Sequence, residues 1–293
     1  MPNLEPSTQI LAPAKINLAL HVVGQRTDGY HLIETLCVFA EDGDRLVVSD
    51  SARDEFEICG PFANAVPASG HNLVMAARDA LRTSFAEEAA GPVAIRLEKN
   101  VPVAAGLGGG SSDAAAALIL LSRHWQLELD NGTLAKTGLP IGADIPMCVH
   151  AVPLIARGVG EAIETIADFP SLAMVLVNPG VPVPTGDIFA GLKSKQNPPL
   201  PALPCDLTVT SLIDWLSSTR NDLQPPAGSL VPEIAESLHA LEGSGAVSAR
   251  MTGSGATCFG IFRSMDEALA AERIIASDYP QWFVKAVETG ASR

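Results

Sequence analysis

Residues 106–110 read Gly-Leu-Gly-Gly-Gly, and the next two residues are Ser111 and Ser112. Each glycine destabilises a regular helix or strand by about 1 kcal/mol, so this cluster is expected where the backbone itself approaches a ligand. An Ala- and Leu-rich stretch follows and predicts a helix from about Asp113 to Arg123. We expect Ser111, Ser112 or Asp113 to cap this helix. Its unpaired N–H groups and its dipole would then form an anion site.

This segment differs from two other glycine-rich phosphate loops. A Walker A loop requires a lysine directly before its final Ser or Thr, and the segment has none. In a dinucleotide fingerprint that starts at Gly106, the third glycine would fall on Ser111. A tight loop before a capped helix would explain one or two glycines, but the observed density favours a third kind of nucleotide triphosphate loop.

Composition limits the classes of partner. The chain has 293 residues, enough for about two domains. Lys and Arg total 19 against 33 Asp and Glu, for a net charge of −14, which disfavours nucleic acid and anionic membranes as partners. No apolar run reaches the roughly 18 residues of a membrane span. The five cysteines are widely spaced and form no CxxC, so we expect neither a zinc site nor disulfides, and a cytoplasmic location.

Three shorter motifs could take part in the same chemistry. Lys15 and Asn17 alternate with apolar residues in a predicted strand from Ile10 to Val23, so both lie on one face, either in water or toward a ligand. Asp144, followed by Pro146, fits a helix N-cap as well as a functional carboxylate. Residues 252–256, Thr-Gly-Ser-Gly-Ala, are a glycine turn that could supply further backbone donors.

The order of predicted elements indicates an α+β fold. Strands and turns dominate the first sixty residues, with turns expected at Asp28-Gly29 and Asp42-Gly43. Asn72 is expected to open a helix. The C-terminal part alternates strands and helices like a split-βαβ domain. The Pro-rich stretch Lys193–Pro204 predicts an exposed loop.

Taken together, these motifs resemble the GHMP kinase superfamily. The glycine segment is similar to its second motif and Met251–Gly255 to its third. Within the superfamily, the similarity is greatest to the branch that acts on a cytidine diphosphate-linked alcohol. The segments that carry the resemblance run over nearly the whole chain: 13–18, 28–31, 106–112, 142–146, 158–161, 184–185 with Phe189, 221–223 and 252–255.

The resemblance implies a two-domain GHMP kinase fold. The N-terminal domain, residues 1–160, would be ribosomal-protein-S5-like and carry the ATP loop. The C-terminal domain, residues 161–293, would be ferredoxin-like with split-βαβ topology. The chain would act as a monomer or a homodimer, with a small molecule as its substrate.

The resemblance also implies roles for individual residues. Lys15 and Asp144 would be the catalytic pair. The acceptor would be held by Asn17, Tyr30, His31, Thr185 and Phe189. ATP would be bound by Asn72, Lys99, Pro102, Val103, Ala104, Ala105, Gly106, Leu107, Gly108, Gly109, Gly110, Ser111 and Ser112.

The implied activity is transfer of a phosphate from ATP, with Mg²⁺, to the 2-hydroxyl of a cytidine diphosphate-linked methylerythritol in a non-mevalonate isoprenoid route. Ser112 is the best candidate for a protein contact to Mg²⁺, although no residue is assigned as a ligand, and Asp113 is expected to cap the helix instead. Two alternatives remain: another GHMP small-molecule kinase of homoserine or phosphomevalonate type, or a non-catalytic nucleotide-binding protein on the same fold.

Overall fold

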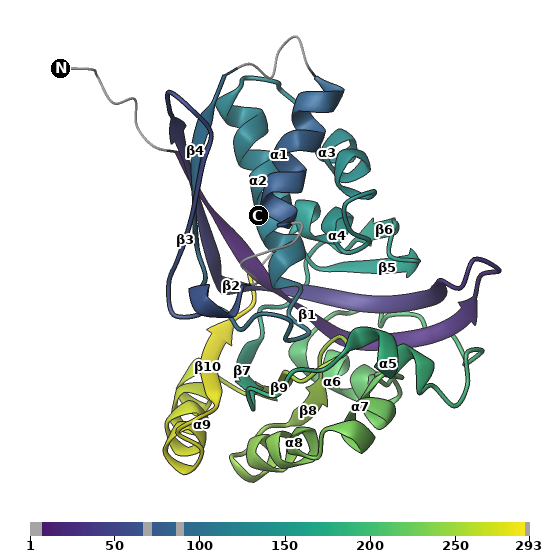
Figure 1. Ribbon diagram of the computed structural model, residues 1–293. Coiled ribbons are helices and arrows are strands. Elements are labelled where there is room, and N and C mark those ends of the chain that lie inside the picture. Colours follow the sequence, from purple (N-terminus) through teal and green to yellow (C-terminus); the bar gives the residue numbers. More distant parts are fainter. Residues whose placement is uncertain (1–7, 67–71, 86–90, 291–293) are drawn as a thin grey trace. The chain divides into compact units, whose positions relative to one another are not determined.

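The computed structural model describes residues 8–66, 72–85 and 91–290 (Figure 1). The chain forms two compact units, each assembled from separate segments. Unit 1 contains the segment that ends at Ala14, together with Asp42–Val103 and Gly108–Ala151. Unit 2 contains Lys15–Glu41, Ala104–Leu107 and the segment from Val152 onward. The predicted division between residues 160 and 161 follows chain order, whereas these units do not.

Two long strands, β1 (Thr8–Gln25) and β2 (His31–Asp50), pair with each other and contribute to both units. In unit 1, β2 pairs antiparallel with β4, and β3 pairs parallel with β4. Helix α2 packs against α1, α3 and α4, and the helices lie side by side in Figure 1. The other elements of unit 1 are β3 (Glu55–Cys59), η1 (Ala63–Ala65), α1 (Leu73–Ser84), β4 (Val93–Glu98), α2 (Gly109–His124), α3 (Asn131–Gly138) and α4 (Ile145–His150).

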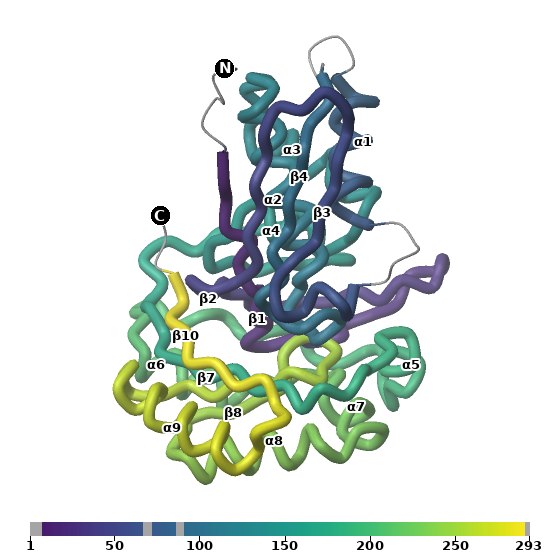
Figure 2. Tube along the Cα trace, turned by 60° about the vertical axis from the view of Figure 1, so that its left-hand side comes forward, coloured from purple at the N-terminus to yellow at the C-terminus, as the bar shows by residue number. Residues whose placement is uncertain are grey.

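Unit 2 contains a four-stranded antiparallel sheet in the order β10-β7-β9-β8. Helices α8 and α9 pack on this sheet, and Figure 2 shows them along the same side of it. The remaining elements of unit 2 are β5 (Leu154–Gly158), β6 (Ala162–Thr165), β7 (Ala173–Asn178), α5 (Thr185–Ala190), α6 (Val209–Ser217), α7 (Gln224–Leu230), α8 (Glu233–Gly243), β8 (Ser248–Met251), β9 (Cys258–Phe262), α9 (Met265–Asp278) and β10 (Phe283–Glu288). The β-α-β alternation predicted for the C-terminal part is confirmed.

The turn predicted at Asp42-Gly43 is wrong, because β2 continues through it without interruption. A Cβ atom on Gly43 would overlap the backbone carbonyl of Ala12. Glycine therefore serves here to let β1 and β2 approach closely, not to reverse the chain. The turn at Asp28-Gly29 is confirmed, with Gly29 at φ +93°.

Within the part of the chain that the structure describes, none of the five cysteines is paired in a disulfide bond. Among the described residues, no helix is both long and apolar enough to cross a membrane.

Candidate active site

The glycine segment is shaped by its contact with a second glycine turn. Gly106 lies in unit 2 with φ +78°. A Cβ atom there would be 2.5 Å from the carbonyl oxygen of Thr252 and 3.0 Å from that of Gly255. The Thr257 N–H also donates to the carbonyl of Ala105 at 3.1 Å. Only glycine fits at position 106. The backbones of two segments that lie about 150 residues apart in the sequence are therefore in direct contact here.

Helix α2 begins at Gly109, four residues earlier than predicted. Its N-cap is Gly108, in the left-handed region at φ +63°, and no side chain caps the helix. The predicted caps Ser111, Ser112 and Asp113 are therefore wrong, because these residues already lie within the first turns. The N-terminus of α2 thus lacks a side-chain acceptor for its N–H groups, which leaves it suited to an anionic ligand.

Ser112 and Asp113 have other partners within unit 1. The Ser112 hydroxyl donates to the carbonyl of Pro13 at 2.7 Å. The Asp113 carboxylate accepts from the Lys99 ammonium at 2.7 Å, and Lys99 also pairs with Asp44. Asp44 in turn accepts from the N–H groups of Asn100 and Val101. We call Asp44, Lys99 and Asp113 the buried triad.

The buried triad is almost completely enclosed. The Lys99 side chain is 3% exposed, and a Cβ atom on Gly109 would lie 3.5 Å from its Nζ. Burial raises the pKa of Asp113 to about 7, although the charge of Lys99 acts in the opposite direction. The ammonium therefore lies beside the start of α2, and its burial leaves little of the Lys99 side chain accessible to adenosine. Asn72 is the N-cap of α1, as expected, and accepts from the Val74 N–H. The proposed contacts of Lys99 and Asn72 with adenosine stay predictions.

Asp144 occupies the N-cap position of α4, with Pro146 in the first turn, yet its side chain makes no capping hydrogen bond. Helix capping therefore explains why Asp144 stands before α4, but it gives no role to the Asp144 carboxylate. Asp144 belongs to unit 1 and Lys15 to unit 2. Their pairing stays a prediction.

The strand that carries Lys15 and Asn17 is buried on both faces, with Lys15 3% and Asn17 2% exposed. A solvated polar face, the alternative interpretation, is excluded. The Lys15 N–H donates to the carbonyl of Leu107 at 2.9 Å, and the Asn17 N–H donates to Thr252 Oγ at 2.8 Å. Within unit 2, the structure thus brings together this strand, residues 104–107 and the 252–255 turn.

The residues predicted to hold a base also lie together in unit 2. The rings of His31 and Phe189 stack with centroids 4.8 Å apart and an interplanar angle of 26°. The neighbouring Tyr30 is 62% exposed. His31 Nε2 is buried and has no hydrogen-bond partner among the described residues. Thr185, the first residue of α5, shares a hydrogen bond with Ser254 of the glycine turn at 2.9 Å.

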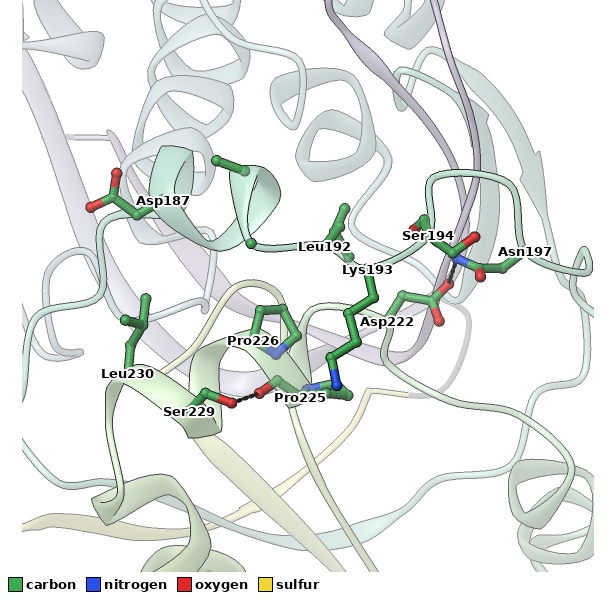
Figure 3. Close-up of a pocket in the computed structure, with 12 residues that line it drawn as sticks. Asp187, Leu192, Lys193, Ser194, Asn197, Asp222, Pro225, Pro226, Ser229 and Leu230 are labelled. Atoms are coloured by element: carbon green, nitrogen blue, oxygen red, sulfur yellow. Dashed lines mark hydrogen bonds between the residues drawn. The ribbon is translucent and has the colours of Figure 1, made fainter.

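A cavity of about 590 Å³ lies beside these residues without including them (Figure 3). Its walls come from α5, α7 and the start of the Pro-rich loop, which contains no helix or strand, as predicted. Asp187, Leu192, Lys193, Pro226 and Leu230 are among its lining residues. The site that the sequence predicts is therefore distinct from this cavity.

Comparison with known proteins identifies the family. The models for the N terminal and C terminal domains of GHMP kinases match residues 72–151 and 209–281. A 4-diphosphocytidyl-2-C-methyl-D-erythritol kinase of Chelativorans sp. is 52% identical over 284 residues, which cover 97% of each chain. The chain belongs to the 4-diphosphocytidyl-2-C-methyl-D-erythritol kinases of the GHMP kinase family. A member of the same family from Agrobacterium fabrum is 52% identical over 284 residues, 95% of each chain.

Solved structures agree with this membership. A crystal structure of a 4-(cytidine 5'-diphospho)-2C-methyl-D-erythritol kinase matches with a TM-score of 0.79 and 31% identity, covering 97% of this chain and 100% of the other. A homoserine kinase from Cytophaga hutchinsonii matches with a TM-score of 0.68 and 16% identity, which supports the shared fold alone. The expected two-domain α+β GHMP fold is confirmed, and membership of this kinase family implies ATP as the phosphate donor.

Sequence reasoning assigned no role to several residues that fix the geometry of the candidate site. Asp44 and Thr35 are both fully buried, and each bonds to a residue that the sequence had singled out. Asn221, in a segment that carried the resemblance but was given no role, donates to the carbonyls of Met251 and Gly253 and so fixes the glycine turn. Thr35 lies between Glu34 and Leu36 in a predicted strand, and this pattern does not reveal its partner.

Proposed function

We propose that this chain transfers the γ-phosphate of ATP to the 2-hydroxyl of 4-diphosphocytidyl-2-C-methyl-D-erythritol, in the methylerythritol phosphate route to isopentenyl diphosphate. Similarity at 52% identity over 97% of the chain supports this substrate over those of other GHMP kinases. The observation that carries the proposal is the stack of His31 on Phe189, where Nε2 of His31 has no partner in the described part of the chain and the neighbouring Tyr30 is exposed.

That arrangement suits a pyrimidine base. Burial lowers the pKa of His31, and the charge of Lys195 lowers it further, so both favour the neutral form of the ring. A neutral imidazole has one donor and one acceptor nitrogen, which matches the mixed edge of cytosine. Tyr30 and Phe189 supply aromatic faces for stacking. Asn17 and Thr185 would contact the rest of the acceptor.

The phosphates of ATP would bind at residues 102–112, where glycines replace side chains and the N-terminus of α2 has no side-chain cap. Phosphoryl transfer depends mainly on positioning and on neutralising charge. We assign Lys15 to stabilising charge on the transferred group. Asp144 would orient the acceptor hydroxyl or take its proton.

Mg²⁺ would neutralise charge on the phosphate oxygens, and it commonly binds through substrate phosphates and retained waters. The Ser112 hydroxyl donates a hydrogen bond to the carbonyl of Pro13, so its hydrogen points away from any cation that its oxygen lone pairs would contact. Ser112 is therefore the residue we assign as a contact for the metal.

The proposal is tested by incubating the purified protein with ATP, MgCl₂ and the acceptor, then identifying the product by mass spectrometry and ³¹P NMR. A new phosphomonoester on the acceptor is expected. Homoserine and phosphomevalonate serve as competing acceptors. Phosphorylation of either of these in preference would overturn the assigned substrate, and ATP binding without transfer to any acceptor would favour a non-catalytic role.

Phe189→Leu is expected to raise the KM of the acceptor about tenfold and to leave the KM of ATP unchanged. Stacking of a base on an aromatic ring contributes about 1–3 kcal/mol, and leucine keeps the apolar volume without the ring. Phe62→Leu, in unit 1, is the matched control. Equal KM values for the acceptor in the Phe189 variant and the wild type would remove Phe189 from the base site.

A further inference from the structure

The side-chain amide of Asn17 has a fixed orientation. Its Nδ2 is 2.8 Å from the hydroxyl of Thr35 and 3.1 Å from the sulfur of Cys37, both on β2. The Thr35 hydroxyl is also 2.7 Å from the carbonyl oxygen of Ala19. A carbonyl oxygen can only accept, so the single hydroxyl proton of Thr35 is donated to Ala19.

It follows that Thr35 must accept from Asn17. The NH₂ group of the amide therefore points to Thr35, and Oδ1 points the other way. The reverse orientation would place two acceptors, Asn17 Oδ1 and Thr35 Oγ, in contact without a proton between them. The donors and acceptors around Asn17 therefore determine which atom of its amide is the oxygen.

In this orientation, Asn17 Oδ1 is buried and has no donor among the residues that the structure describes. A buried acceptor without a donor is unfavourable, and such atoms in native proteins call for an explanation. The backbone of Asn17 is fixed separately, through its N–H bond to Thr252. The oxygen therefore has a set position and lacks only a donor.

We propose that Thr35 is a positioning residue that presents the carbonyl oxygen of Asn17 to a hydroxyl group of the acceptor. This inference rests on the proposed function, because it takes the acceptor to be a polyol bound beside Lys15 and Asn17. Strand alternation places these two side chains on one face of β1.

The orientation has a consequence for specificity. A carbonyl oxygen accepts a hydrogen bond from an alcohol but repels the oxygens of a phosphate, whereas an NH₂ group would attract those oxygens. With Lys15 attracting phosphate on the same face, the oxygen of Asn17 favours a hydroxyl at its own position. Thr35 touches neither reactant in this scheme. It would still determine the preference for a hydroxyl over a phosphate, because it fixes the orientation of the Asn17 amide.

The test compares Thr35→Val, which is nearly isosteric but lacks the hydroxyl, with Thr35→Ser, which retains it. We expect Thr35→Val to raise the KM of the acceptor about tenfold, as loss of a well-made hydrogen bond predicts. The KM of ATP should stay unchanged, and Thr35→Ser should remain within about twofold of the wild type. Thr83→Val, which removes an exposed hydroxyl in α1, is the matched control.

Deoxy analogues of the acceptor, each lacking one hydroxyl, identify the group that Asn17 recognises. The wild type should discriminate about tenfold against one analogue, and Thr35→Val should lose that discrimination, since the two losses share one interaction. If Thr35→Val does not fold, the wild type and Thr35→Ser must still both discriminate against that same analogue.

Equal KM values for Thr35→Val and the wild type would overturn the inference, as would independent, additive effects of the variant and every deoxy analogue. A wild-type protein without transfer to this acceptor would instead overturn the proposed function. The two failures are therefore distinguishable.

Discussion

Lys15→Met and Asp144→Asn are each expected to lower kcat by about 10²–10⁴-fold with little change in the KM of ATP. Methionine keeps the length of the lysine side chain but cannot stabilise charge on the transferred phosphate. Asparagine keeps the shape of Asp144 but cannot take a proton. Because Asp144 makes no capping hydrogen bond, its replacement should not weaken α4. Single-turnover and steady-state kinetics measure both effects.

The controls are charge changes at exposed positions. Lys136→Met in α3 and Asp278→Asn at the end of α9 remove the same charges from the surface and should leave kcat unchanged. Circular dichroism and thermal unfolding verify that the variants are folded. Folded Lys15→Met and Asp144→Asn proteins with kcat near the wild-type value would contradict both assignments.

The sequence predicted the fold best where a local signal determines the structure. Asn72, as an N-cap, begins α1 at the expected place. Helices α5 and α7 were not predicted, because they have only six and seven residues and show too little periodicity. A glycine after an aspartate was an ambiguous indicator, because Gly29 lies in a turn and Gly43 does not. Gly43 is needed for the close approach of β2 to Ala12 on β1, which the sequence of β2 alone does not reveal.

The candidate site shows the same limit. The sequence singled out Asn17, the glycine segment and the 252–255 turn, and within unit 2 the structure brings together Asn17, Gly106 of that segment and Thr252 of that turn. The sequence could not provide the partners that orient them. Whether Asn17 presents its oxygen or its nitrogen depends on Thr35, which lies on β2 and donates its own proton to the carbonyl of Ala19. Such bonds join distant positions and leave no periodic pattern.

The buried triad gives the largest expected effect on stability. Lys99→Met leaves Asp44 and Asp113 buried without their shared cation, and breaking a buried ion pair in this way costs about 3–5 kcal/mol. The urea midpoint of unfolding should therefore fall strongly. We also expect a higher KM for ATP in any folded fraction. The reason is that Lys99 Nζ would lie only 3.5 Å from a Cβ atom on Gly109, at the start of α2.

The pH dependence tests the cause of this loss. The pKa of Asp113 in the folded chain, about 7, lies above the usual 3.8, so its stabilising contribution is complete below pH 3.8 and is lost as pH rises through 7. Removing the ammonium raises the pKa of Asp113 further. The urea midpoint of Lys99→Met should therefore fall further below that of the wild type at pH 8 than at pH 5.5, because Asp113 can bind a proton at pH 5.5.

Asp113→Asn separates charge from packing. This variant keeps the ion pair of Lys99 with Asp44 and removes the carboxylate that titrates, so its midpoint should vary less with pH than that of the wild type. The double variant Lys99→Met/Asp113→Asn leaves one buried carboxylate, which still accepts from Asn100 and Val101. It should unfold at a higher urea concentration than Lys99→Met alone. A double variant less stable than Lys99→Met at pH 8 would show that lost packing, and not uncompensated charge, causes the effect.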